Sequence, residues 1–181
     1  MKFLVILLLF GWFSNRSDNS IIYIQPCNNF KNTKQVVKEL EKVIDAKFII
    51  LPDKNLDNSL LNDYKTRYRA DKIIRSIHNK YLTIVLLHND ISLPYRNRPD
   101  WGVLGLSLIP GKTCVASDYR LKNKRRDFWK VVYHEYIHTR YNYKHCPKDN
   151  PECIMRDAKG KAYFGNKHSL CNYCKKILKP E

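Results

Sequence analysis

The sequence has few acidic residues, and glutamate is the scarcer of the two acids. Its 17 acidic residues are 12 Asp and 5 Glu, against 33 Lys and Arg, so the net charge is +16 with histidine neutral. A charge of this size favours anionic partners, which keeps nucleic acid among the candidates at this point. Because glutamates are so few, a motif that requires one has little chance of arising by accident.

Other absences narrow the class of protein. We find no internal repeat and no low-complexity tract, and no apolar run is long enough to span a bilayer as a helix. Six cysteines in 181 residues are too few for a mini-protein built on disulfides. With 44% hydrophobic and 28% charged residues, the composition indicates one folded domain and excludes disorder, collagen and a multi-domain chain.

The N-terminus has the pattern of an export signal. Met1 and Lys2 precede an apolar run from Phe3 to Phe10, and a polar Asn/Ser stretch follows. We interpret residues 1–16 as a signal peptide or export segment, and therefore expect a periplasmic or extracellular protein without a transmembrane anchor. The alternative is a buried N-terminal strand or helix. If the protein is exported, its cysteines could oxidise.

Residues 20–141 have the periodicity of an αβ unit. Apolar positions predict strands that alternate with amphipathic helices, in the order Ile21–Ile24, Thr33–Ala46, Phe48–Leu51, Asp71–Lys80 and Tyr81–Leu87. This rhythm indicates a sheet with helices packed on it. After a loop predicted for Leu93–Asp100, two apolar runs predict a hairpin, Val103–Ile109 and Thr113–Ser117. A long helix is then predicted for Lys122–Tyr141.

The long helix contains the motif HEYIH at positions 134–138. His134 and His138 are four positions apart and share one helix face, so both imidazoles can bind one zinc ion. Glu135 is then placed to take a proton from the attacking water and pass it to the leaving amine. A pair of solvated histidines is the alternative, but the flanking residues are largely apolar and indicate a buried helix.

A third zinc ligand has to come from outside the helix. His145 is the nearest candidate, but it is seven residues after His138, two turns away along a straight helix. The helix must therefore end and the chain must turn back. Asn142 is the expected turning residue, because asparagine readily adopts the left-handed conformation that ends helices.

Residues 142–181 differ from the rest in being rich in Lys and Cys and poor in aliphatic side chains, with one helix predicted for Lys167–Leu178. Their cysteines form the pattern C-x6-C-x17-C-x2-C, at Cys146, Cys153, Cys171 and Cys174. Four thiolates could hold a structural zinc, which would supply folding energy to a segment with little core of its own. Two disulfides are the alternative. Cys27 and Cys114 are either buried small hydrophobes or a further disulfide.

The combined motifs resemble the archaemetzincins, a family of zinc metallopeptidases in the metzincin group. The resemblance covers residues 80–178. It is carried by SDYRL from Ser117, HEYIHTRYNYKHC from His134, Cys153-Ile154-Met155 and Cys171-Asn172-Tyr173-Cys174, and WGVLGLSLIPGKTCVAS from Trp101 is similar to the strand pair before the active-site helix.

The resemblance implies a compact zincin-like α+β fold, in which a mixed twisted sheet is flanked by helices and followed by a small Cys-rich C-terminal zinc-binding subdomain, residues 142–181. It implies two zinc ions per chain. The catalytic ion would be held by His134, His138 and His145 with Glu135 as general base, and the structural ion by Cys146, Cys153, Cys171 and Cys174. Met155 would form the methionine turn beneath the catalytic metal.

The motif departs from the family pattern, HExxHxxGxxHC, by one residue. Here an extra residue precedes the third histidine, and counting back from His145 places Asn142 where the family has glycine. The simplest alignment puts the extra residue at the end of the helix. Asparagine in place of glycine preserves the turn, because both residues adopt the left-handed conformation.

The sequence therefore predicts a zinc-dependent metallopeptidase that hydrolyses peptide bonds in a peptide or protein substrate, as a monomer. Acidic peptides would be favoured if a basic run near the start of the long helix faces the substrate, and otherwise this run is a solvated face: Lys122, Lys124, Arg125, Arg126 and Lys130. The alternatives are an inactive pseudo-peptidase and a zinc-stabilised basic module for acidic partners or nucleic acid. Nucleic acid is disfavoured because a module that reads it does not need Glu135 between two ligand histidines.

Overall fold

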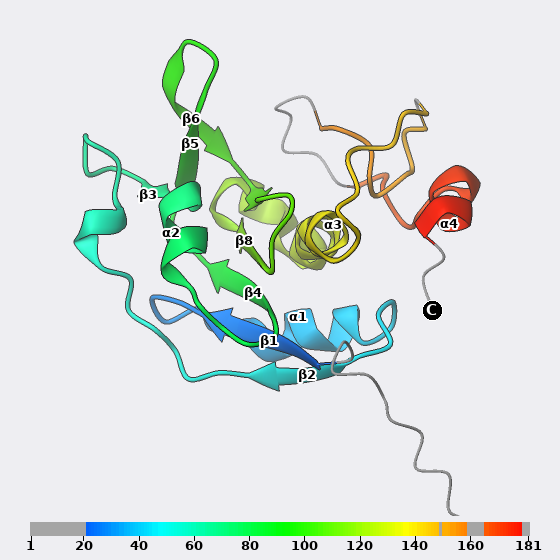
Figure 1. The fold of residues 1–181 in the computed structure, drawn as a ribbon, viewed down its shortest axis with the longest axis horizontal. Helices are drawn as coiled ribbons and strands as arrows, with labels where there is room; N and C mark the ends of the chain where they lie inside the picture. The colour runs from blue at the N-terminus through cyan, green and yellow to red at the C-terminus, as the bar shows by residue number, and fades with distance from the viewer. Residues whose placement is uncertain (1–20, 149, 159–164, 179–181) are drawn as a thin grey trace, which may run out of the picture.

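A five-stranded mixed sheet forms the centre of the molecule (Figure 1). The computed structural model describes residues 21–148, 150–158 and 165–178. The strand order is β2-β1-β4-β8-β7, and neighbouring strands are parallel except for β7 and β8, which are antiparallel. The strands are β1 (Ile21–Pro26), β2 (Lys47–Ile50), β4 (Leu82–Leu87), β7 (Gly105–Ser107) and β8 (Thr113–Ser117). The predicted α+β class and the β7–β8 hairpin are confirmed.

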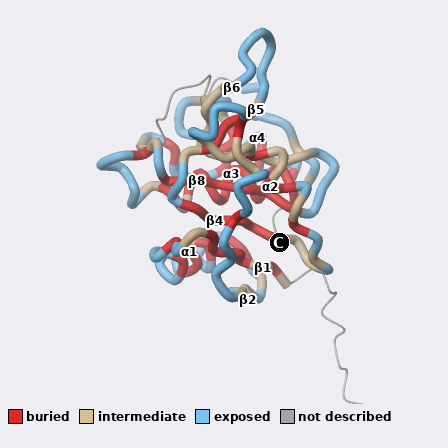
Figure 2. The backbone as a smooth tube through the Cα atoms, turned by 90° about the vertical axis from the view of Figure 1, so that its left-hand side faces the viewer, coloured by how far each residue is buried: buried red, intermediate tan, exposed pale blue. Residues whose placement is uncertain are grey.

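A second, three-stranded sheet was not predicted. It has the order β3-β5-β6 and consists of β3 (Tyr68–Arg69), β5 (Ile91–Tyr95) and β6 (Arg98–Val103). The loop predicted for Leu93–Asp100 is therefore wrong: this stretch forms most of the β5–β6 hairpin, whose turn contains Arg96 at a φ of 51°. Main-chain pairing between antiparallel strands holds the hairpin together. Its prolines and charged side chains interrupt the apolar alternation from which strands are predicted. The tip extends away from the body and is exposed (Figures 1 and 2).

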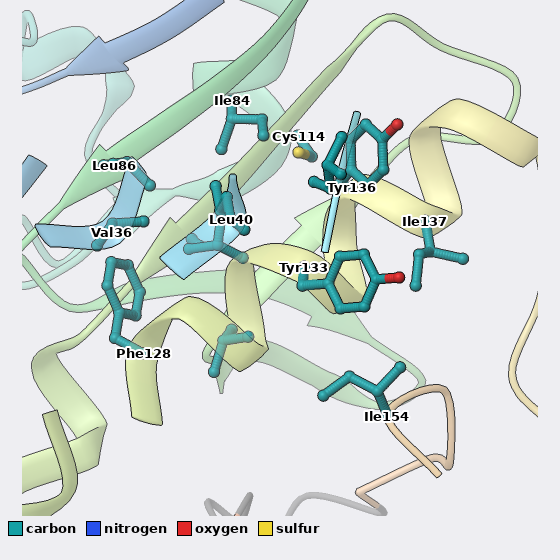
Figure 3. Close-up of a cluster of buried hydrophobic side chains, with 14 of the residues drawn as sticks. Val36, Leu40, Ile84, Leu86, Cys114, Phe128, Tyr133, Tyr136, Ile137 and Ile154 are labelled. Carbon is teal, nitrogen blue, oxygen red and sulfur yellow. The ribbon is translucent and has the colours of Figure 1, made fainter. Parts of the chain in front are cut away.

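Helices pack on both faces of the main sheet. On β4, Ile84 and Leu86 face one apolar cluster, while Val85 and Leu87 face the other. The first cluster contains side chains of α1 (Thr33–Leu40) and α3 (Phe128–Tyr141), and Figure 3 shows Leu40, Phe128 and Tyr133 within it. The second contains side chains of α2 (Ala70–Ser76). The strand alternation that predicted a sheet thus also assigns the two helix layers.

Three helices are shorter than predicted. α1 ends at Leu40, six residues before Ala46, and α2 covers Ala70–Ser76 where the sequence predicted Asp71–Lys80. The long helix begins at Phe128 instead of Lys122, because the preceding residues form the 3₁₀ segment η3 (Tyr119–Asp127), which is interrupted at Lys122 with φ 46° and ψ −116°. Another 3₁₀ turn, η2, spans Asn58–Leu60. Cationic residues follow one another in η3, and no apolar repeat marks the kink.

The described part of the C-terminal segment packs on α3. It contains one helix, α4 (Asn172–Leu178), where the sequence predicted Lys167–Leu178. Six of its buried side chains belong to the same cluster as α3: Cys153, Ile154, Met155, Leu170, Cys174 and Leu178. In Figure 3 Ile154 lies beside Tyr133 of α3. The segment therefore extends the core of the main sheet on the side of α3.

The predicted export segment, residues 1–16, lies outside the described residues, and within the described ranges no helix has the length and apolar character to cross a membrane.

Cys27 and Cys114 are buried free thiols that belong to the two different apolar clusters, on opposite faces of the sheet. The predicted alternative of a disulfide between them is therefore wrong.

Candidate active site and thiolate cluster

Helix α3 and the turn after it bring three histidines together. The helix runs through the core, and it buries His134 and His138 on one face. It ends at Asn142, which has φ 50° and ψ 30°, the left-handed conformation. The reversal at Asn142 returns the chain toward the helix, so that the ring of His145 lies 5.2 Å from that of His134 and 4.9 Å from that of His138.

The histidine side chains are oriented by main-chain carbonyls. His134 Nδ1 lies 2.7 Å from the carbonyl oxygen of Ile154, and His138 Nδ1 lies 2.5 Å from that of Tyr143. A carbonyl oxygen only accepts hydrogen bonds, so each Nδ1 carries the proton and each Nε2 presents a lone pair. The two Nε2 atoms lie 3.0 Å apart. Two lone pairs directed at each other this closely are unfavourable unless a cation lies between them.

The protonation state of the three histidines fits metal binding. Burial lowers the pKa of His134 well below its usual value and the pKa of His138 to about 4, and it also lowers the pKa of His145. Neutral imidazole is the form that binds a metal. Zinc–nitrogen bonds of about 2.0–2.1 Å place two ligand nitrogens of a tetrahedron roughly 3.3 Å apart. One ligand atom from each histidine, all within 4.8 Å of one another, is therefore a set that a zinc ion could bind.

Glu135 is buried beside this cluster and is held from strand β7. Ser107 Oγ lies 2.8 Å from the carboxylate Oε2 of Glu135 and 2.8 Å from its main-chain oxygen. Burial raises the pKa of Glu135 to about 7, and the hydrogen bond from Ser107 opposes this shift. Gly105 provides the room, since a Cβ at this position would lie 2.6 Å from Glu135 Cγ. The carboxyl group is therefore fixed, and its pKa suits proton transfer near neutral pH.

Four cysteines form a second cluster in the C-terminal segment. They are free thiols, and their Sγ atoms all lie within 4.8 Å of one another: Cys146, Cys153, Cys171 and Cys174. The Cys146–Cys171 and Cys153–Cys174 sulfur separations are both 3.7 Å, far longer than the roughly 2.05 Å of a disulfide. Zinc–sulfur bonds of about 2.3 Å give a tetrahedral edge of roughly 3.8 Å. The arrangement fits a four-thiolate metal site.

Short connections join the two clusters. The Ile154 carbonyl that orients His134 comes directly after Cys153, and the next carbonyl, that of the fully buried Met155, accepts a hydrogen bond of 2.8 Å from the Cys146 amide. Tyr143 contacts both clusters, since its carbonyl orients His138 and its hydroxyl lies 3.5 Å from Cys174 Sγ. His145 is the neighbour of Cys146 in sequence. Each histidine is thus connected to the cysteine cluster: His145 through the chain, His134 through the Ile154 carbonyl, and His138 through two hydrogen bonds of Tyr143.

The histidines open into a cleft with a volume of about 1400 Å³. Its walls are formed by β7, the β5–β6 hairpin, η3 and α3, and Glu135, His134, His138 and His145 lie along it. Among the described residues, edge strand β7 is paired with β8 on one side only. A cleft that contains both the histidines and an unpaired strand edge can accept an extended chain next to Glu135.

The sequence and the fold were each compared with those of known proteins. No family model matches the chain. The curated archaemetzincin of Halobacterium salinarum is 24% identical over an alignment that covers 80% of this chain and 90% of that protein. In sequence and in fold, the chain is similar to the archaemetzincins.

Solved archaemetzincin structures share the fold. The protein from Archaeoglobus fulgidus, in complex with malonate, has a TM-score of 0.66 and 24% identity, covering 86% of this chain and 98% of its own. The archaemetzincin from Methanopyrus kandleri has a TM-score of 0.69 at 19% identity, covering 90% and 95%. A zinc-dependent peptidase from Methanocorpusculum labreanum also has a TM-score of 0.69, at 17% identity, covering 87% and 99%.

Archaemetzincins are a family of zinc metallopeptidases, and a peptidase family implies peptide substrates. Zinc is accordingly the metal that this similarity and the two clusters support. The alternative of a basic binding module for nucleic acid or acidic partners is not favoured by these relatives.

Several residues of this candidate site were not predicted from the sequence. Ser107, Tyr143 and the cleft arginines Arg96 and Arg98 belong to no motif, because their roles arise from contacts between distant segments. For Gly105 the only signal in the sequence is that glycine is rare, with six in the whole chain. Of the basic run near the start of the long helix, only Lys122 lines the cleft. Lys130 is buried, and its ammonium lies 2.9 Å from Asp127.

Proposed function

We propose that this protein is a zinc-dependent peptidase whose zinc is held by His134, His138 and His145 and whose general base is Glu135. The observation that carries the proposal is that three neutral imidazoles converge next to a buried carboxyl group in one cleft. When bound, zinc supplies an acidified water and polarisation of the scissile carbonyl.

Glu135 moves the proton in this proposal. Its Oε1 is the oxygen that Ser107 does not contact, whereas Ser107 holds Oε2. With a pKa of about 7 from burial, the carboxylate accepts a proton from the attacking water and returns it to the leaving amine. His134 and His138 donate their Nδ1 protons in hydrogen bonds to main-chain carbonyls and take no part in the proton transfer.

The four cysteines hold a second zinc in the proposal, which gives two ions per chain. Two observations support this. The sulfur separations match a tetrahedral thiolate site, and the segment between Asn142 and α4 contains no long helix or strand among its described residues. Metal binding would contribute the folding energy that such a segment lacks.

The test compares the parent protein with Glu135→Gln. The amide cannot accept the proton, so we expect peptide hydrolysis to fall by about 10²- to 10⁴-fold while two zinc ions remain bound. The matched control is Glu41→Gln, an exposed glutamate after α1, which should leave both quantities unchanged. Zinc is measured by atomic absorption and hydrolysis with a quenched fluorescent peptide library. Unchanged hydrolysis in Glu135→Gln, or a parent without zinc, contradicts the proposal.

A further inference from the structure

The β5–β6 hairpin carries a group of arginine and aromatic side chains, in which Tyr95, Arg96 and Arg98 are exposed and Trp101 is half-buried. The Arg98 guanidinium lies 4.6 Å from the ring centre of Trp101, and that of Arg96 lies 5.3 Å from the ring centre of Tyr95. The two rings are themselves 6.2 Å apart. Stacking restricts the arginines without neutralising them, so they keep their charge and their hydrogen-bond donors.

These two arginines line the same cleft as the histidines, and their charge is not compensated there. The other cleft arginines are engaged: Arg67 pairs with Asp90 and Asp100, and Arg120 pairs with Asp90. Arg96 and Arg98, by contrast, have no ion pair with any described residue. Lys122 and Lys144 add two more exposed cations to the cleft wall.

The chain itself relates the hairpin to the reacting centre. Strand β6 continues through Leu104 into β7, where Gly105 contacts Glu135. Arg98 precedes Gly105 by seven residues, a path of at most roughly 23 Å of extended chain. A substrate that lies extended along this wall would therefore place side chains up to about seven residues from its cleaved bond beside the hairpin.

We propose that Arg96 and Arg98 form a subsite for acidic side chains, and that the substrates are peptides with aspartate or glutamate several residues from the cleaved bond. The inference rests on the proposed peptidase function. Arginine suits this role because its planar group binds carboxylates through paired hydrogen bonds. The rings of Tyr95 and Trp101 already restrict the two arginine side chains, so the arginines lose less conformational freedom when a ligand binds.

The experiment uses three peptides that differ only at the distal positions, which carry Asp/Glu, Asn/Gln or Lys. We expect the acidic peptide to be cleaved with a kcat/KM roughly tenfold above its amide counterpart, through KM, because each exposed pair contributes modestly. The advantage should shrink as salt is raised. In Glu135→Gln, fluorescence anisotropy should show the same order of binding without turnover.

Charge reversal identifies the subsite. Arg96→Glu with Arg98→Glu should abolish or invert the preference and leave cleavage of the amide peptide unchanged, with thermal melting as the check on folding. The matched control is Lys34→Glu with Lys38→Glu, which makes the same change in net charge on the exposed side of α1 and should keep the preference.

The outcomes separate the two proposals. If no peptide of any charge is hydrolysed, the proposed function fails, whereas the anisotropy measurement still tests the subsite. If acidic and amide peptides bind and react equally, or if the hairpin reversal keeps the preference, the subsite proposal is overturned. It is also overturned if an oligonucleotide binds to the hairpin more tightly than the acidic peptide does.

Discussion

The histidine cluster and the cysteine cluster lie side by side but depend on different kinds of structure. His134 and His138 project from a helix that is buried between the sheet and the C-terminal segment, whereas the cysteines come from turns and the short helix α4. Apolar packing positions the first set whether or not metal is bound. The second set lies in a segment with few elements of its own, so its metal would contribute to folding. Four substitutions test this contrast.

The largest effect is expected at Cys153, which is buried and belongs to the turn that also carries Ile154 and Met155. Cys153→Ser should reduce bound zinc from the two proposed ions to one or none and expose residues 142–178 to proteolysis, because a proposed ligand and a buried apolar contact are both lost. Atomic absorption and limited trypsin digestion measure the two effects. Cys114→Ser removes an equally buried thiol outside the cluster and should keep both ions; an equal loss of zinc would contradict the contrast.

The next effect is expected at Asn142, whose left-handed conformation returns the chain to bring His145 near α3. Asn142→Val places a β-branched residue in a conformation that costs it about 1–3 kcal/mol, so zinc affinity at the histidines should fall roughly 10- to 100-fold. Competition with a chromophoric chelator measures this affinity. Asn142→Gly, which accepts the conformation, should retain it, and weak binding by the glycine variant would show that the turn is not the cause.

A smaller effect is expected at Gly105, where the missing side chain leaves room for Glu135. In Gly105→Ala the added Cβ would lie 2.6 Å from Glu135 Cγ, so the carboxylate or the strand must shift. We expect hydrolysis to fall about 10- to 100-fold with both zinc ions retained, because misplacing a reacting group slows the chemistry without removing a ligand. Steady-state kinetics measure the effect. Gly111→Ala, which alters a glycine in the β7–β8 connection, separates damage to the hairpin from damage to Glu135.

The smallest effect is expected at Tyr143, which contacts both clusters. Tyr143→Phe removes the hydroxyl next to Cys174 Sγ but keeps the carbonyl next to His138, so the cysteine site should lose about 0.5–1.5 kcal/mol of metal affinity and the histidine site almost none. Cobalt substitution distinguishes the sites, because only thiolate ligands give an intense charge-transfer band. Tyr173→Phe serves as the control, and a weaker histidine site in Tyr143→Phe would show that the two clusters are more tightly coupled than the contacts suggest.

How well the sequence predicted each feature depended on whether the feature is local. The HEYIH motif predicts two histidines on one helix face from spacing alone, and the sheet follows from apolar alternation in strands such as Leu82–Leu87. The β5–β6 hairpin follows from neither rule, since its strands contain Pro94 and Pro99 and few buried side chains. Its strands are held by main-chain pairing, and Asp100 of β6 forms an ion pair with Arg67.

The candidate site shows the same division. The ligand residues could be named from the sequence, because cysteine and histidine are few and their spacing is constrained by metal geometry. The hydrogen bond from Ser107 to Glu135 joins residues 28 positions apart, and nothing near either residue indicates it. The predicted start of α3 was wrong for a related reason. The kink at Lys122 is a change of backbone conformation within a run of cationic residues, all of which are compatible with a helix.

The carbonyl groups that orient His134 and His138 also bear on how far this site can diverge in sequence. A substitution at position 143 or 154 changes the side chain but leaves the carbonyl in place, provided that the turn keeps its shape. Histidines oriented by side-chain carboxylates would instead lose their orientation with a single replacement. The orientation of the two imidazoles therefore tolerates substitutions around them. A distant relative can keep the same imidazole geometry while few of the surrounding side chains remain the same.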